Sequence, residues 1–185
     1  MKYYDYNRIL NENTKYNLII APRASGKTVG AIKILIERYL KTEEIQYIDS
    51  TYDFLRNSNY LENIIKNMFP EISVFIKYPG VFIKRKHEQD YSLAIAINCN
   101  NKRHIYYPPD YVYIEELYVN YEKGIKIIDE YVKAGAQKII TALNKADIEE
   151  CSYLYKYFPW FDDYEGFKVI CDKENYTIDF VKNED

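Results

Sequence analysis

The sequence has 185 residues, of which 48% are apolar and 29% charged, with a net charge of −3 at pH 7. This composition describes an ordinary globular domain that can bury a core without disulfide bonds. It disfavours a surface that is basic all round, and no apolar run approaches the roughly 20 residues that a membrane-spanning helix needs. The N-terminus, MKYYDYNRIL, lacks the apolar segment of a signal peptide. Three cysteines, an odd number without a secretion signal, indicate reduced thiols in a cytoplasm.

The first half of the chain predicts strands that alternate with helices. A continuous apolar run over residues 17–21 is typical of a strand buried on both faces of a parallel sheet. Apolar residues recur at helical spacing over 28–40 and again over 53–68, with a second strand at 45–50 between them. Shorter strands are predicted at 73–76, 81–84 and 93–98, the last two flanking KRKHEQD as a hairpin with a long tip.

The second half continues the alternation. The run YVYIEE, residues 111–116, predicts a strand that ends in two carboxylates, and a helix is expected from about 123 to 133. A strand at 137–142 and a helix beginning near Ala146 follow, and the segments 167–171 and 176–181, separated by DKEN, predict a C-terminal β-hairpin. Together these elements predict a doubly wound, mostly parallel α/β sheet with helices on both faces and its site at the carboxyl ends of the strands.

The stretch NLIIAPRASGKT, residues 17–28, has the pattern of a phosphate-binding loop between a strand and a helix. In such a loop, backbone N–H groups and the helix N-terminus bind the anion, a lysine reaches the outer phosphates and a Ser or Thr hydroxyl holds Mg²⁺. Ala replaces the usual opening glycine, which keeps the amide but resists left-handed conformations. The predicted nucleotide-binding residues are Ala21, Pro22, Arg23, Ala24, Ser25, Gly26, Lys27 and Thr28. The alternative interpretation is a lysine that merely starts a helix.

The paired acids of YVYIEE supply the other half of an ATPase site. A P-loop ATPase needs a carboxylate near Mg²⁺ and a group that orients the attacking water. If the acidic strand lies beside the loop strand, Glu115 faces the metal together with Thr28, and Glu116 faces the γ-phosphate as the catalytic residue. An Asp is the common first acid, so the longer Glu115 is a departure that bears on Mg²⁺ geometry. An exposed acidic pair at a strand end is the alternative.

Three further residues are candidates for catalysis or coupling. Arg23 is a long cation inside the loop, and phosphate binding alone does not require it, so we expect it to stabilise charge in the transition state, in cis or in trans. Thr141 and Asn144 lie at the end of the next apolar strand, where polar side chains can sense the γ-phosphate and couple its loss to movement. Turn chemistry explains Asn144 equally well.

Two basic clusters flank the predicted strand at 93–98. Their cations can bind DNA phosphates without reading sequence, although solvated loops explain them equally well. The candidate DNA contacts are Lys84, Arg85, Lys86, Lys102 and Arg103.

These residues resemble a family, the DNA-packaging ATPases or encapsidation proteins of small podovirus-like tailed phages, which are related to the terminase large subunits. The loop APRASGKT carries Arg at its third place, as terminase-type loops of the form GGRGSGKS do. The run YPPDYVYIEE is similar to the family's acidic strand, and ITALN is similar to its coupling motif. The N-terminal YDYNRILN is also similar to a segment that lies near the adenine in relatives.

The resemblance implies an ASCE-type P-loop ATPase, dependent on ATP and Mg²⁺, that moves double-stranded DNA in a viral genome-packaging machine. We expect residues 1–185 to form one ATPase domain, without the nuclease-like C-terminal domain that family members usually carry. The implied partners are double-stranded DNA, a portal and procapsid, and further copies of the chain in a homo-oligomeric ring, in the host cytoplasm and away from any membrane. Lys133 and Lys138 lie in the region where the family supplies a cation to a neighbouring subunit.

Other functions remain open on the sequence alone. A nucleoside kinase or a helicase-like P-loop ATPase would share the loop without any tie to packaging, and a nucleotide-binding regulator would bind without turnover. The letters NKAD at 144–147 match the guanine-selective NKxD pattern. A GTPase would, however, carry DxxG at the acidic strand, where this chain has EELY.

Overall fold

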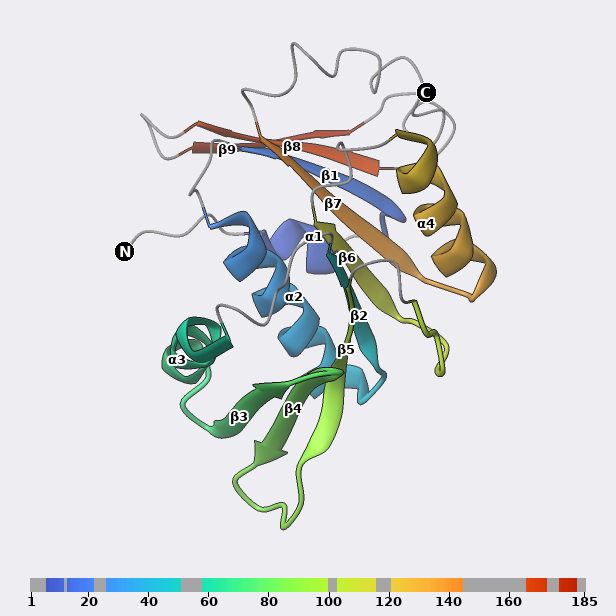
Figure 1. The fold of residues 1–185 in the computed structure, drawn as a ribbon. Coiled ribbons are helices and arrows are strands. Elements are labelled where there is room, and N and C mark those ends of the chain that lie inside the picture. Colours follow the sequence, from blue (N-terminus) through green and yellow to red (C-terminus); the bar gives the residue numbers. More distant parts are fainter. Residues whose placement is uncertain are drawn as a thin grey trace.

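The protein is described by a computed structural model that covers residues 6–11, 13–21, 26–50, 58–99, 103–115, 121–144, 166–172 and 177–182 (Figure 1). Its helices are α1 (Asn7–Asn11), α2 (Lys27–Thr42), α3 (Ser58–Met68) and α4 (Tyr121–Lys133). Its strands are β1 (Tyr16–Ala21), β2 (Gln46–Ser50), β3 (Ile72–Lys77), β4 (Gly80–Arg85), β5 (Ser92–Cys99), β6 (Tyr111–Glu115), β7 (Lys138–Asn144), β8 (Gly166–Asp172) and β9 (Thr177–Lys182). Among the described residues, no helix is long and apolar enough to cross a membrane.

The nine strands form one sheet in the order β3-β4-β5-β2-β6-β7-β1-β8-β9. From β5 to β8 every neighbouring pair is parallel, and the antiparallel pairs are β3 with β4, β4 with β5, and β8 with β9. The prediction of a mostly parallel α/β sheet is therefore confirmed. The acidic strand does not lie beside the loop strand as the sequence-based interpretation assumed, because β7 is inserted between β1 and β6.

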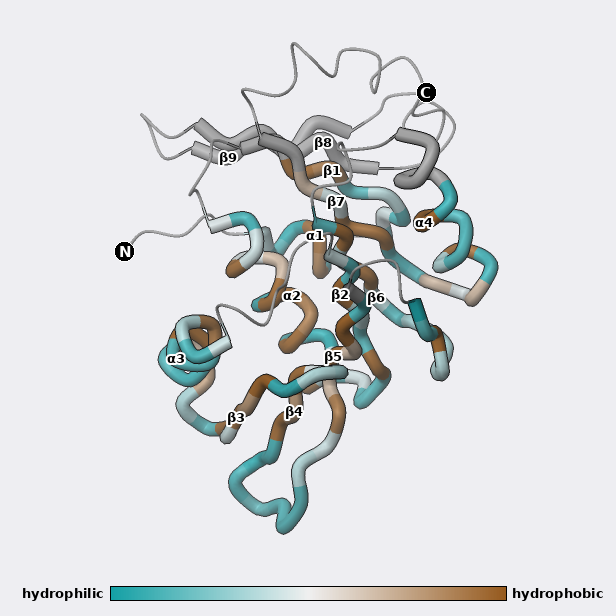
Figure 2. The backbone as a smooth tube through the Cα atoms, in the orientation of Figure 1, coloured by the Kyte–Doolittle hydropathy of each residue, from teal (hydrophilic) through white to brown (hydrophobic). Residues whose placement is uncertain are grey.

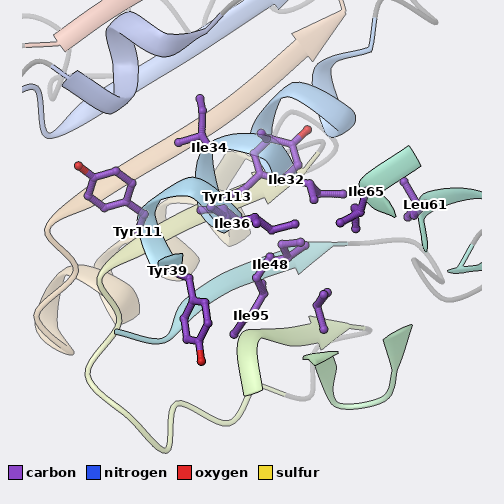
Figure 3. Packing of buried hydrophobic residues seen from close by; sticks show 14 of the residues in the cluster. Ile32, Ile34, Ile36, Tyr39, Ile48, Leu61, Ile65, Ile95, Tyr111 and Tyr113 are labelled. Carbon is purple, nitrogen blue, oxygen red and sulfur yellow. The ribbon is translucent and has the colours of Figure 1, made fainter. Parts of the chain in front are cut away.

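Helices cover both faces of the sheet, and each face has its own apolar core. In β2, Ile48 packs with α2 and α3, whereas its neighbour Tyr47 packs with α4, because successive side chains of a strand point to opposite faces. Figure 3 shows Ile32 and Ile36 of α2 among side chains of the strands. In Figure 2 the strands at the centre of the sheet are largely hydrophobic, and the turn between β4 and β5 is hydrophilic.

The element predictions hold best where the apolar pattern is long. The helix predicted at 28–40 is α2, which ends at Glu43 in a left-handed conformation, with the Glu43 N–H donating to the Tyr39 carbonyl at 2.7 Å. The helix predicted from residue 53 begins at Ser58 in the described part of the chain, and residues 51–57 lie outside it. The helix predicted near Ala146 also lies outside the described residues. Helix α1 was not predicted, since five residues are too few to show a period.

Helix α3 lies beside the antiparallel end of the sheet. The carboxylate of Glu62 on α3 accepts a hydrogen bond of 2.8 Å from the backbone N–H of Ile76 on β3. On β3 and β4 the rings of Phe75 and Phe82 stack with centroids 4.9 Å apart. These contacts join α3, β3 and β4 into one unit next to β5.

A buried carboxylate, Asp110, lies directly before β6, at the amino ends of the central parallel strands. Asp110 accepts hydrogen bonds from the Arg38 guanidinium at 2.6 and 3.2 Å and from the Gln46 amide at 3.1 Å. Its backbone carbonyl accepts from the N–H groups of Gln137 and Lys138. One residue therefore ties α2, β2 and the start of β7 to the start of β6.

The N-terminal segment packs against the first turn of α2, and this contact generates a testable prediction. A Cβ added to Gly30 would lie 2.2 Å from two ring atoms of Tyr6, a buried side chain. Gly30→Ala should therefore destabilise the protein by about 1–3 kcal/mol, although alanine is the better helix former. Urea unfolding measures the effect. In a Tyr6→Ala background the Gly30→Ala substitution should be neutral or stabilising, and an equal loss in both backgrounds would refute the contact.

Candidate active site

The carboxyl ends of the parallel strands and the start of α2 meet at one edge of the sheet. β1 ends at Ala21, and α2 begins at Lys27 after Gly26. Gly26 has φ 80°, a left-handed conformation that glycine adopts without strain, and its carbonyl accepts the Gly30 N–H at 2.8 Å. Strand, loop and helix thus follow in the predicted order. The predicted loop residues Pro22, Arg23, Ala24 and Ser25 lie outside the described residues.

The hydroxyl of Thr28 reaches the acidic strand across the inserted β7. Thr28 Oγ1 donates to Oε1 of Glu115 at 2.5 Å. The two residues predicted to hold Mg²⁺, 87 positions apart in the sequence, are therefore direct hydrogen-bond partners. Glu116, the predicted catalytic residue, lies outside the described residues.

Glu115 has a second hydroxyl partner that the sequence-based interpretation missed. Ser50 at the end of β2 donates from Oγ to Oε2 of Glu115 at 2.9 Å. Ser50 and Glu115 are paired in register, and Glu115 is in turn paired with Ala142 of β7. The carboxylate accepts one hydroxyl at each oxygen, so its position is fixed from two sides. The available signal was a pair of polar residues, Asp49 and Ser50, that directly follow Tyr47 and Ile48 at the end of the strand.

A polar network lies one residue away, on the face of the sheet that α4 covers. Asp49 accepts from Arg103 Nε at 2.6 Å and from the Tyr131 hydroxyl at 3.1 Å. Asn98 donates to the same Tyr131 oxygen at 2.7 Å and accepts the His104 N–H. Burial raises the pKa of the Asp49 carboxyl above its usual value, and the Arg103 guanidinium opposes this rise. Burial also raises the pKa of the Tyr131 hydroxyl, so Tyr131 stays a neutral donor.

Thr141 on β7 is buried between the two neighbouring strands of the site. It is 3% exposed and paired in register with Leu18 of β1 and Ile114 of β6. Its hydroxyl oxygen has no hydrogen-bond partner in the described part of the chain. Because a buried hydroxyl without a partner is rare, Thr141 is a position to test by substitution. Asn144, the other predicted coupling residue, ends β7 in register with Ala21.

The predicted DNA contacts are not equivalent. Arg103 is 16% exposed and held by Asp49, and Arg85 binds Glu43 and the Leu40 carbonyl at the end of α2, so both guanidinium groups have structural partners. Lys84 is half-buried, with its ammonium 5.0 Å from the centroid of the Tyr91 ring, and Lys86 is exposed. Lys102 lies outside the described residues. Among the described residues of this set, Lys86 is the exposed cation, and its contact with a phosphate backbone stays a prediction.

Of the two lysines predicted as cations for a neighbouring subunit, one is buried and the other is exposed. Lys138 is 3% exposed, its ammonium donates to the Ile9 carbonyl, and it lies over the Tyr111 ring. The ammonium of Lys138 is therefore engaged within its own chain, and its role toward a neighbouring subunit stays a prediction. Lys133 is exposed in the last turn of α4 and remains a prediction.

No family model matches the sequence, and a search of curated proteins gives no match. Among solved structures, the chain is similar to the N-terminal domain of the DNA packaging ATPase from bacteriophage phi29, with a TM-score of 0.63 and 16% identity over 95% of this chain and 99% of that one. It is also similar to a chain of the bacteriophage phi29 viral genome packaging motor assembly, with a TM-score of 0.55 and 18% identity over 77% of this chain and 47% of that one. A third similar structure is the large terminase ATPase domain of Thermus phage P74-26, in a mutant form. Its TM-score is 0.51, with 11% identity over 78% of this chain and 66% of that one.

These three likenesses concern the fold. The match to the isolated N-terminal domain covers nearly all of both chains, whereas this chain spans about half the length of the protein in the motor assembly. This chain therefore shares its α/β fold with these phage packaging ATPase domains.

The Asp49 network gives a prediction about stability. Asp49→Ala would remove the near carboxylate of the largely buried Arg103 guanidinium and leave it the exposed Glu130 carboxylate at 3.9 Å. Removing one partner of a buried ion pair typically costs about 3–5 kcal/mol. Urea unfolding should show a loss of that size. Glu43→Ala, which removes the exposed partner of Arg85, is the matched control and should change stability by less than about 1 kcal/mol. Equal effects of the two substitutions would contradict a buried network at Asp49.

Proposed function

We propose that this chain is an ATP-hydrolysing motor domain that drives translocation of double-stranded viral DNA into a procapsid. The observation that carries the proposal is the hydrogen bond between Thr28, at the start of α2, and Glu115, at the end of β6. It brings a hydroxyl and a carboxylate together beside a helix N-terminus that follows a strand and a glycine-containing loop. The fold likeness to phage packaging ATPase domains supports the choice of packaging over other P-loop functions.

The donor set fits a Mg²⁺–ATP complex. Mg²⁺ prefers oxygen ligands, and a Thr hydroxyl beside a carboxylate is the pair with which P-loop ATPases hold it. In this proposal Thr28 and Glu115 hold the metal, while Lys27 and the backbone amides of residues 21–28 bind the phosphates. When bound, Mg²⁺ neutralises charge on the phosphate oxygens.

The remaining roles fall to residues around this pair. Glu116 orients the attacking water and accepts its proton, and Arg23 stabilises the charge that develops on the transferred phosphoryl group. Thr141 and Asn144 on β7 respond to loss of the γ-phosphate, because β7 lies between the loop strand and the acidic strand. The proposed partners are double-stranded DNA, a portal and procapsid, and further copies of this chain in a ring, with Lys133 as the candidate cation for a neighbouring subunit. The proposed location is the host cytoplasm.

Steady-state hydrolysis tests the proposal. The purified protein should hydrolyse ATP faster than GTP, and double-stranded DNA should stimulate turnover. Lys27→Ala should lower kcat about 10²- to 10³-fold because a cation that stabilises the transferred charge is lost. Glu116→Gln should bind ATP normally and lose turnover to a similar extent. Lys66→Ala, an exposed lysine on α3, is the matched control and should leave turnover unchanged.

The outcomes separate the functions that share a P-loop. Tight ATP binding without turnover in the wild type, with or without DNA, would favour a nucleotide-binding regulator. Turnover that DNA does not change would favour a P-loop enzyme unconnected with packaging. Preference for GTP would assign NKAD to guanine recognition instead of coupling.

Thr141 allows a test of coupling with a variant that should remain folded. Thr141→Val keeps the shape of the side chain and removes the buried hydroxyl that has no partner among the described residues. The substitution should raise the free energy of unfolding by about 1 kcal/mol, since an unsatisfied polar group is removed. The same variant should bind ATP and lose DNA stimulation. A stabilised variant with full DNA-stimulated turnover would show that Thr141 has no part in coupling.

A further inference from the structure

The side chain of Glu115 is one methylene longer than that of the aspartate usual at this position, so its carboxylate is harder to hold in one orientation. Each added bond gives the carboxylate further rotamers, and the last torsion of a glutamate is broad. A metal ligand must instead be held in one orientation, because Mg²⁺ accepts little distortion of its octahedron. Some other group therefore has to fix the longer side chain if it is to act as a ligand.

Ser50 is placed to do this. Its Oγ donates to Glu115 Oε2 at 2.9 Å, while the other carboxylate oxygen, Oε1, receives the Thr28 hydroxyl. The parallel register sets Ser50 directly beside Glu115. Ser50 is 2% exposed, so its hydroxyl is shielded from bulk water that would compete for the carboxylate.

The strand that carries Ser50 is itself held from the opposite face. The preceding residue, Asp49, is bound by Arg103 from the segment after β5 and by Tyr131 from α4. The carboxyl end of β2 therefore cannot shift without breaking a buried ion pair. The backbone that carries Ser50 and the carboxylate that its hydroxyl binds are therefore both held by hydrogen bonds.

We infer that Ser50 is a positioning residue of the metal site, whose hydroxyl holds the longer carboxylate of Glu115 so that one oxygen remains directed to Thr28 and Mg²⁺. This inference rests on the proposed function. Ser50 acts through Glu115 and does not touch nucleotide. Groups that hydrogen-bond to metal ligands typically change metal affinity 10- to 100-fold when they are removed.

Binding of a fluorescent ATP analogue, titrated with Mg²⁺ and compared with EDTA, tests the inference without relying on turnover. Ser50→Ala should raise the Mg²⁺ concentration needed for half-maximal enhancement of binding at least about tenfold. Its affinity for the analogue in EDTA should equal that of the wild type. Ser50→Thr keeps the hydroxyl and should restore the Mg²⁺ response, whereas Ser50→Cys, of similar size but a weak donor, should not. Ser92→Ala, at the exposed start of β5, is the matched control.

A double-mutant cycle shows whether Ser50 acts through the carboxylate. Glu115→Ala should abolish most of the Mg²⁺ enhancement, and adding Ser50→Ala should produce no further loss. Additive losses would overturn the inference, as would equal losses of affinity in Mg²⁺ and in EDTA, which indicate general damage to the site. Thermal unfolding of each variant identifies such damage directly.

The wild-type titration separates this inference from the proposed function. Wild-type protein that binds no nucleotide, or binds it equally with Mg²⁺ and EDTA, would overturn both. A Mg²⁺ response in the wild type that Ser50→Ala leaves unchanged would overturn the positioning role alone.

Discussion

The site depends on one carboxylate that accepts hydrogen bonds at both of its oxygens. Glu115 receives Thr28 from α2 on one side and Ser50 from β2 on the other, so a helix and two strands converge on a single side chain. Because β7 separates the loop strand from the acidic strand, no backbone pairing joins β1 to β6 directly. The Thr28–Glu115 hydrogen bond therefore connects the helix that follows β1 to the end of β6, although these two strands are not paired.

Successive side chains of a β-strand point to opposite faces of the sheet, so two neighbouring residues of β2 can belong to two different polar clusters. Ser50 and Asp49 are neighbours in sequence, yet one binds Glu115 on the α2 side and the other binds Arg103 and Tyr131 on the α4 side. Residues paired in register form a row across neighbouring strands. One such row contains Asn98 of β5, Asp49 of β2, Ile114 of β6 and Thr141 of β7. Tyr131 of α4 thus contacts, through Asp49, the residue that precedes Ser50 in β2.

The sequence predicted the fold class, most strands and the start of α2, because these depend on local periodicity and on the glycine and lysine at a strand-to-helix junction. It did not predict the insertion of β7 or the hydrogen bond between Ser50 and Glu115. Both depend on the order of the strands, which is set by contacts between segments that are distant in the sequence. The basic residues illustrate the same limit. Arg85, Arg103 and Lys138 look like solvated cations in the sequence, but each has a partner set by tertiary structure.

The hydrogen bond between Glu62 and the Ile76 amide has a consequence for association between copies. β3 is the outermost strand on its side of the sheet, and an outermost strand offers unpaired amides to any other strand that approaches. Here the Ile76 N–H is already satisfied by a carboxylate, which also places negative charge along that border. Strand addition at β3 would have to displace Glu62 and α3 first. Extension of the sheet at this point of β3 by another strand would therefore cost the Glu62 hydrogen bond.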